Sequence, residues 1–190
     1  MPAKKDMKRI FLIGFMGAGK TTLGKALAHR MGLSYIDTDH FIEHRYRKKI
    51  TDIFTSEGEE HFRNIEHRMI CEIAEFEDVV VSTGGGLPCF HDNIGIMNQV
   101  GLTVFVDVSV EELTARLEGN KTSRPVLQGR SGKELMSFIS ETLNKRSMFY
   151  QQAKIHINGN LMKTEDDINT LAVQLERLVI ASHSRESRKP

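Results

Sequence analysis

Short apolar runs alternate with longer amphipathic stretches along the chain. The runs at 10–13, 34–37, 79–82, 103–108 and 154–158 predict strands. The first of them, IFLI, is continuously apolar, which is typical of a strand buried on both faces of a parallel sheet. Strands that alternate with helical segments predict a layered α/β fold with a mainly parallel sheet.

The segments between the runs have the spacing of helices. Apolar residues recur at helical spacing from about Thr21 to Gly32, and a second apolar stripe occupies 57–77. Capping-box pairs that begin at Ser109 and Thr164 mark two later helix starts.

A polar stretch at about 117–133 interrupts this alternation. It contains three glycines, a proline and four basic residues, and it is too long for an ordinary connection. We expect a mobile flap or a disordered loop there. No internal repeat or second domain is visible, so residues 1–190 form one predicted domain with a core of about 9–180 and polar tails at both ends.

Composition limits the possible partners. The 190 residues are 39% hydrophobic and 27% charged, with a formal net charge of +1, which argues against general binding to nucleic acid or membranes. No run approaches the roughly 18 apolar residues of a membrane span, and the N-terminal nine residues lack the apolar centre of an export signal. We therefore expect a cytoplasmic protein.

Two cysteines, Cys71 and Cys89, are expected to be free thiols in that reducing compartment. His67 and Cys71 have a spacing that could offer two zinc ligands from one helix, but no second pair completes a tetrahedral site. Cys89 and His91 receive no role from the sequence. We interpret His67 and Cys71 as partly buried helix residues.

A glycine-rich stretch follows the first predicted strand. Gly14, Gly19, Lys20 and Thr21 match the pattern G-x-x-x-x-G-K-[ST]. Glycines let successive backbone N–H groups turn toward a phosphate, and the following helix directs its positive N-terminal end to the same place. Lys20 would reach the outer phosphates, and the Thr21 hydroxyl would bind Mg²⁺. The stretch predicts a nucleotide-binding loop.

A phosphate-binding loop fits a kinase, an NTP-driven motor or a GTP-binding switch. The small chain leaves little room for a motor, and it has no N-K-x-D stretch for reading guanine. A small-molecule kinase needs a second pocket for its acceptor. The three glycines at 84–86 permit close approach of a ligand, although a tight turn would also explain some of them.

Asp37 closes the predicted strand at 34–37, and Asp39 opens the helix that follows. Asp37 and Asp39 lie near the C-terminal edge of the sheet, where open α/β folds bind ligands. Asp39 could instead merely cap the helix that follows. Asp107 is a rival candidate for a magnesium carboxylate, because an aspartate after a buried strand is also typical of a Walker B motif.

Six segments, in order, resemble the motifs of the shikimate kinase family. They are GFMGAGKTTLGKALA, DTD at 37–39, IFTSEGEEHFRNIE at 53–66, STGGG at 82–86, NKTSRPVL at 120–127 and RSMFYQQA at 146–153. The resemblance runs from about Arg9 to Ile180. It implies a three-layer α/β/α P-loop kinase fold, similar to nucleoside monophosphate kinases, with a five-stranded parallel sheet and a lid at 117–133.

The same resemblance implies an activity and a set of nucleotide-binding residues. The family transfers the γ-phosphoryl group of ATP, as its Mg²⁺ complex, to the 3-hydroxyl of shikimate. Thr21 and Asp37 would hold Mg²⁺, Arg116 would stack on adenine, and Arg124 would arrive when the lid closes. The nucleotide-binding set is Gly17, Ala18, Gly19, Lys20, Thr21, Thr22, Arg116 and Arg124. No residue after the last strand is assigned to the adenine.

The resemblance also implies the acceptor site. The substrate-binding set is Asp39, Arg63, Gly84, Gly85, Gly86 and Arg146, and the catalytic set is Lys20, Asp39 and Arg124. A guanidinium group suits a carboxylate because it can donate two parallel hydrogen bonds. From their local sequence alone, Arg63 on a charged helix and Arg146 on an amphipathic helix would more often be solvated surface residues, and it is the resemblance that assigns them to the substrate. Phe54 and Phe62 match pocket positions of the family, but core packing would explain them as well.

Two other functions stay open from the sequence. One is a gluconate or nucleoside monophosphate kinase, and the other is a non-catalytic ATP-binding module. We expect ATP and shikimate as the binding partners, no nucleic acid or membrane partner, and a monomer.

Overall fold

The fold is built on one parallel sheet. In the computed structural model, residues 8–119, 127 and 129–186 are described, with side chains described as far as residue 182. The strands are β1 (Arg9–Ile13), β2 (Ser34–Asp37), β3 (Val79–Ser82), β4 (Leu102–Asp107) and β5 (Ile155–Asn158). All neighbours pair in parallel, in the order β2-β3-β1-β4-β5. The predicted five-stranded sheet is confirmed, with β4 placed one residue earlier than expected.

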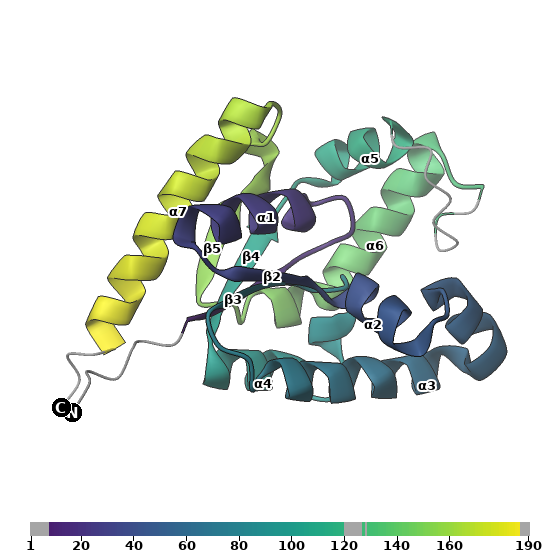
Figure 1. Cartoon of the computed structure of the whole chain (residues 1–190). Coiled ribbons are helices and arrows are strands. Elements are labelled where there is room, and N and C mark those ends of the chain that lie inside the picture. The colour runs from purple at the N-terminus through teal and green to yellow at the C-terminus, as the bar shows by residue number, and fades with distance from the viewer. Residues whose placement is uncertain (1–7, 120–126, 128, 187–190) are drawn as a thin grey trace.

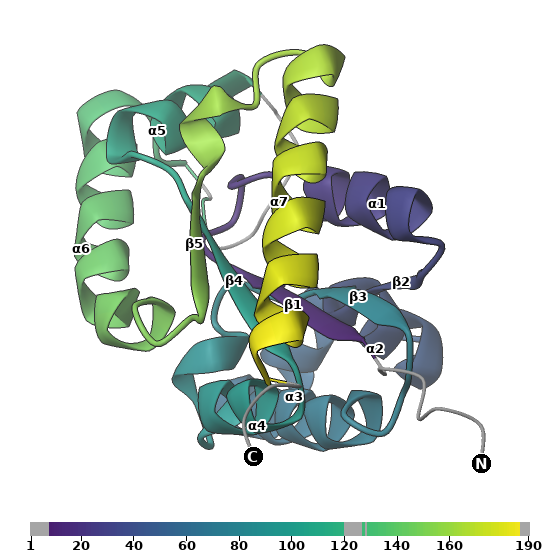
Figure 2. The ribbon, with the colours of Figure 1, turned by 90° about the vertical axis from the view of Figure 1, so that its left-hand side faces the viewer.

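Helices cover both faces of this sheet (Figure 1). The α-helices are α1 (Lys20–Met31), α2 (Thr38–Tyr46), α3 (Ile50–Ile73), α4 (Asn93–Val100), α5 (Val110–Gly119), α6 (Gly132–Tyr150) and α7 (Glu165–Glu186). Two short 3-10 helices are η1 (Leu87–Cys89) and η3 (Gly159–Leu161). Helices α1 and α7 pack together on one face and α3 and α4 on the other, while α5 packs against α6 (Figure 2).

The alternation of side chains along β1 explains the three layers. Ile10 and Leu12 point into the cluster formed with α1 and α7, whereas Phe11 and Ile13 point into the cluster formed with α3 and α4. All four are fully buried. A strand with no exposed face must be apolar at every position, which is why IFLI does not alternate.

Two boundaries differ from the sequence expectations. Helix α3 begins at Ile50 rather than near Glu57, and it is two helical pieces that meet at Gly58, whose backbone is non-helical (φ 83°, ψ 169°). The predicted flap is narrower than 117–133, because 117–119 end α5 and 132–133 begin α6. Leu117 is held in helix because its side chain is buried in the core. Arg124 lies outside the described residues.

The topology brings three loops to one edge of the sheet. Strand β3 lies between β2 and β1, and its last residue, Ser82, pairs with Asp37 and with Leu12. The glycine loop after β1, the aspartates after β2 and the three glycines after β3 therefore leave the sheet side by side. Among the described helices, none is long and apolar enough to cross a membrane.

Candidate active site

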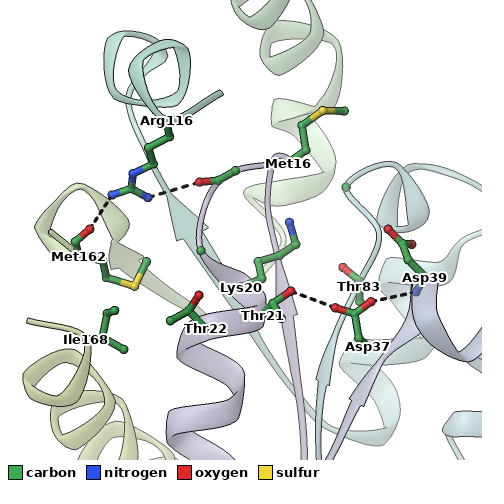
Figure 3. Close-up of a pocket in the computed structure, with 13 residues that line it drawn as sticks. Met16, Lys20, Thr21, Thr22, Asp37, Asp39, Thr83, Arg116, Met162 and Ile168 are labelled. Carbon is green, nitrogen blue, oxygen red and sulfur yellow. Dashed lines mark hydrogen bonds between the residues drawn. The ribbon is translucent and has the colours of Figure 1, made fainter. Parts of the chain in front are cut away.

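A cavity of about 360 Å³ opens where these loops meet (Figure 3). Its lining comes from the first glycine loop and the start of α1, from the aspartate and triple-glycine loops, from α5 and α7, and from Met162 after η3. The lining residues are Met16, Gly17, Gly19, Lys20, Thr21, Thr22, Asp37, Asp39, Thr83, Gly85, Arg116, Met162 and Ile168. Most of the predicted nucleotide-binding residues thus border one space.

The first glycine loop has the backbone that a phosphate-binding loop needs. Gly14 has φ 140°, and a Cβ at that position would lie 2.8 Å from the carbonyl oxygen of Val106. Gly19 has φ 92° and precedes the first residue of α1, so the N-terminus of that helix faces the cavity. Lys20 is buried, and its Nζ donates hydrogen bonds of 2.8 Å to the carbonyl oxygens of Gly14 and Phe15.

The carboxylates after β2 have distinct positions. Asp37 caps α2, because its Oδ1 accepts hydrogen bonds from the backbone N–H groups of Asp39 and His40. Its Oδ2 accepts a 2.9 Å hydrogen bond from the Thr21 hydroxyl, as Figure 3 shows. The alternative in which Asp39 is the helix cap is therefore wrong. Asp39 lies in the first turn of α2 and borders both the cavity and the triple glycine.

Asp107 occupies a different place. It is the exposed last residue of β4 and pairs in register with Asn158. Among the described residues, the cavity lining includes Asp37 and Asp39 but not Asp107. The pair Thr21 and Asp37 offers hydroxyl and carboxylate oxygens at one point, which fits Mg²⁺, since this ion usually takes one or two protein ligands besides substrate phosphates. No cluster of three or more metal-ligating side chains occurs in the described part of the chain.

Arg116 joins two walls of the cavity. Its Nη1 donates to the carbonyl oxygens of Gly17 and Ala18, and its Nη2 donates to those of Gly159 and Met162. Its Nε donates to Glu112. The guanidinium therefore fastens the first glycine loop to the segment that follows β5 (Figure 3).

Met162 and Ile168 provide the apolar part of this wall, and sequence reasoning missed both. A Cβ at Gly19 would lie 2.7 Å from Cε of Met162, so the methionine covers the glycine loop. Ile168 lies on α7 and faces the same cavity. Neither residue belongs to a recognised motif, so the sequence analysis assigned them no role. The one available signal was that Met162 is an apolar residue shortly after the last strand.

The triple glycine is surrounded by charged side chains. A Cβ at Gly84 would lie 2.7 Å from Oδ1 of Asp39, and one at Gly86 would lie 2.9 Å from Nη1 of Arg63. A Cβ at Gly85 would lie 3.4 Å from Nη1 of Arg146. The glycines are present because polar groups from α2, α3 and α6 converge on this backbone. A tight turn alone does not explain them.

Arg63 is buried, with 11% of its side chain exposed. Its Nη1 donates a 2.6 Å hydrogen bond to Glu66, and its Nε and Nη2 donate to Glu59. Interpreting Arg63 as a solvated surface residue is therefore wrong. A guanidinium has five N–H donors, so these three bonds leave one N–H on Nη1 and one on Nη2 for an acceptor.

Glu66 is a second site residue that the sequence did not reveal. Its side chain is only 2% exposed, and burial raises its pKa to about 7, although the neighbouring Arg63 opposes that rise. The sequence did contain a signal for this contact, because residues three apart on a helix are neighbours and Glu66 follows Arg63 at that spacing. A buried pair of this kind fixes the orientation of a guanidinium, because each charge is costly to leave unpaired.

Arg146 is half-buried beside the same glycines. Its Nη1 is buried and, within the described residues, has no hydrogen-bond partner. Tyr150, one helical turn later on α6, donates a 2.7 Å hydrogen bond to the carbonyl oxygen of Gly85 and is itself buried. A buried N–H without a partner is unusual in a folded chain, and it indicates a place for an acceptor oxygen.

Comparisons with known proteins agree with this geometry. Residues 16–176 match the model of the shikimate kinase family. The shikimate kinase of Parabacteroides distasonis is 55% identical over 173 residues, which are 91% of this chain and 100% of that protein.

Two solved structures are similar throughout. A shikimate kinase from Bacteroides thetaiotaomicron is 48% identical with a TM-score of 0.88, covering 90% of this chain and 98% of that chain. A shikimate kinase from Acinetobacter baumannii, solved in complex with shikimate, is 30% identical with a TM-score of 0.82, covering 94% of this chain and 96% of that chain.

Proposed function

The chain belongs to the shikimate kinase family, and from this premise we propose how its own residues transfer the γ-phosphoryl group of ATP to the 3-hydroxyl of shikimate. The nucleotide occupies the cavity lined by the first glycine loop. Its phosphates accept hydrogen bonds from the backbone of Gly17, Ala18 and Gly19 and from Thr22, at the positive end of α1. Arg116, Met162 and Ile168 enclose the base.

Lys20 moves to the outer phosphates when ATP binds, exchanging backbone carbonyl oxygens for phosphate oxygens. Mg²⁺, when bound with ATP, neutralises charge on the phosphates. Thr21 and Asp37 would hold that ion through their hydroxyl and carboxylate groups. Arg124, outside the described residues, is proposed to complete the site from the lid.

The acceptor lies against the triple glycine. Its carboxylate accepts hydrogen bonds from Arg63 and Arg146, and Gly84, Gly85 and Gly86 let the ring approach the backbone closely. Asp39 lies between this place and the nucleotide cavity. It accepts the hydrogen bond of the attacking hydroxyl and orients the oxygen toward the γ-phosphorus. It takes the hydroxyl proton as the new P–O bond forms and the bond between the γ-phosphorus and the β,γ-bridging oxygen breaks, which releases ADP.

The buried Nη1 of Arg146 is the observation that carries this assignment of the acceptor site. A carboxylate oxygen would supply the partner that this N–H lacks. Neither a solvated arginine nor a non-catalytic ATP-binding module requires a buried, unpaired guanidinium N–H beside a backbone of three glycines.

The test is Mg²⁺-dependent ADP release from ATP with shikimate, gluconate, AMP or CMP added separately. We expect release with shikimate only. Arg63→Ala should raise the KM for shikimate by 10-fold or more, roughly the value of a charged hydrogen bond, and change the KM for ATP little. Arg68→Ala is the matched control, because Arg68 is an exposed arginine on the same helix. Equal losses for both substrates would make Arg63 a structural residue.

The metal assignment has a separate test. Asp37→Ala should lose most Mg²⁺-dependent turnover, whereas Asp107→Ala should keep it. The reverse result would assign the magnesium carboxylate to Asp107. We also propose that the enzyme works in the cytoplasm, where ATP is supplied and Cys71 and Cys89 stay reduced, and that it is a monomer. Sedimentation at working concentration would test the monomer.

A further inference from the structure

The segment 87–93, which follows the triple glycine, places an aromatic ring on Arg63. The guanidinium carbon of Arg63 lies 4.3 Å from the centroid of the Phe90 ring. Phe54 and Phe62 lie farther away, at 5.7 and 5.4 Å. Phe90 is therefore the nearest ring in a group of three around this cation, and the distance is within the range of a cation–π contact.

The loop that carries Phe90 is fastened to the helix that carries Arg63. The side chain of Asn93 is fully buried and donates a hydrogen bond to the carbonyl oxygen of Leu87. Its Oδ1 lies 2.8 Å from Nδ1 of His67. Since the Asn93 amide group already donates to Leu87, Oδ1 is the acceptor and His67 donates. His67 is one helical turn beyond Arg63 on α3, so the ring and the guanidinium are tied to the same element.

A ring restrains Arg63 in a way that another carboxylate could not. Glu59 and Glu66 already accept three of its five N–H donors, and a third carboxylate would occupy the donors left for a ligand. It would also repel an incoming anion. A cation–π contact engages the π face of the ring and consumes no N–H donor.

We propose that Phe90 is a positioning residue for substrate, whose ring holds the Arg63 guanidinium so that its two remaining N–H groups face the acceptor carboxylate. This inference rests on the proposed function of Arg63. It assigns a role to the segment LPCFHDN, which had none from its sequence. Phe90 is 36% exposed, so its side chain can be substituted without opening a cavity in the core.

The first experiment compares Phe90→Leu with Phe90→Tyr by steady-state kinetics. Leucine keeps an apolar side chain but removes the π face, and tyrosine retains it. We expect Phe90→Leu to raise the KM for shikimate roughly 3- to 10-fold with kcat and the KM for ATP unchanged, and Phe90→Tyr to resemble the parent chain. Phe76→Leu is the control, because Phe76 is a half-buried phenylalanine that packs on Phe41 instead of a cation.

The second experiment asks whether Phe90 acts through Arg63. In an Arg63→Gln background, Phe90→Leu should lower kcat/KM for shikimate less than 2-fold, because no guanidinium is left to stack. An equal loss in both backgrounds, or a Phe90→Tyr variant as weak as Phe90→Leu, would overturn the positioning role. If the parent chain itself shows no activity with shikimate, the proposed function fails instead, so the two failures are distinguishable.

Discussion

Gly86→Ala tests whether the triple glycine exists to make room for Arg63. The backbone of Gly86 has φ −86° and ψ −21°, which alanine adopts without strain. The new Cβ would lie 2.9 Å from Nη1, 3.0 Å from Nη2 and 3.2 Å from Cζ of Arg63. These contacts are too short, so the guanidinium must move, although Glu66 and the Phe90 ring restrain it.

The expected loss follows from the hydrogen bonds that Arg63 would no longer align. Losing one hydrogen bond to a charged group costs about 1.5–3 kcal/mol, or roughly a 10- to 100-fold rise in the KM for shikimate. The KM for ATP should stay within about 2-fold, since Gly86 does not line the nucleotide cavity. Steady-state kinetics with each substrate varied in turn measure both quantities.

The matched control is Gly119→Ala. Gly119 ends α5, its φ is not positive, and a Cβ there would meet no described atom within 4 Å. Denaturation with urea should give Gly119→Ala nearly the stability of the parent chain, because alanine also restricts the unfolded chain. An unchanged KM for shikimate in Gly86→Ala, or a loss shared equally with ATP, would refute the reasoning about space at Gly86.

Three further predictions concern neighbouring groups. The pKa of Glu66 rises from 4.5 to about 7 on folding, so the folded chain holds this proton more tightly. The contribution of Glu66 to the free energy of unfolding is therefore fully present below pH 4.5 and is lost, by about 3 kcal/mol, as the pH rises from there through 7, and Glu66→Gln should lose this component of the pH dependence in urea titrations. Arg116→Ala, which frees four carbonyl oxygens on two loops, should raise the KM for ATP about 10-fold or more and leave the KM for shikimate nearly unchanged in kinetic assays. Tyr150→Phe leaves the Gly85 carbonyl unpaired and should lower the free energy of unfolding, measured in urea, by about 1–3 kcal/mol. It should also raise the KM for shikimate in kinetic assays.

The sequence was sufficient for the features that depend on neighbouring residues. Five apolar runs specified five strands, and the pattern from Gly14 to Thr21 specified a phosphate-binding loop, because a strand, its turn and the next helix start are local. The positions of Asp37 at the end of β2 and Asp39 just after it also followed, since parallel strands end at one edge of the sheet.

The sequence was not sufficient where a local pattern has two physical meanings. The local sequence around an arginine on a charged helix does not distinguish a solvated side chain from a buried one. Arg63 is buried because α3 packs against the triple glycine, which only the tertiary structure shows. The same holds for aspartate after a strand. Only the sheet order distinguishes the two aspartates. Asp37 ends β2 and contacts Thr21, whereas Asp107 ends β4, on the opposite side of β1.

Tertiary structure alone decided the contacts that join distant segments. Tyr150 reaches a carbonyl 65 residues earlier in the chain, and Arg116 reaches Gly159, 43 residues later. No periodicity or motif spacing records such pairs, because they arise when separate elements pack on a common sheet. The sequence by itself determined which chemical groups are present and where the sheet would collect them. Packing determined which of those groups are buried, which are paired and which keep an N–H available for a ligand.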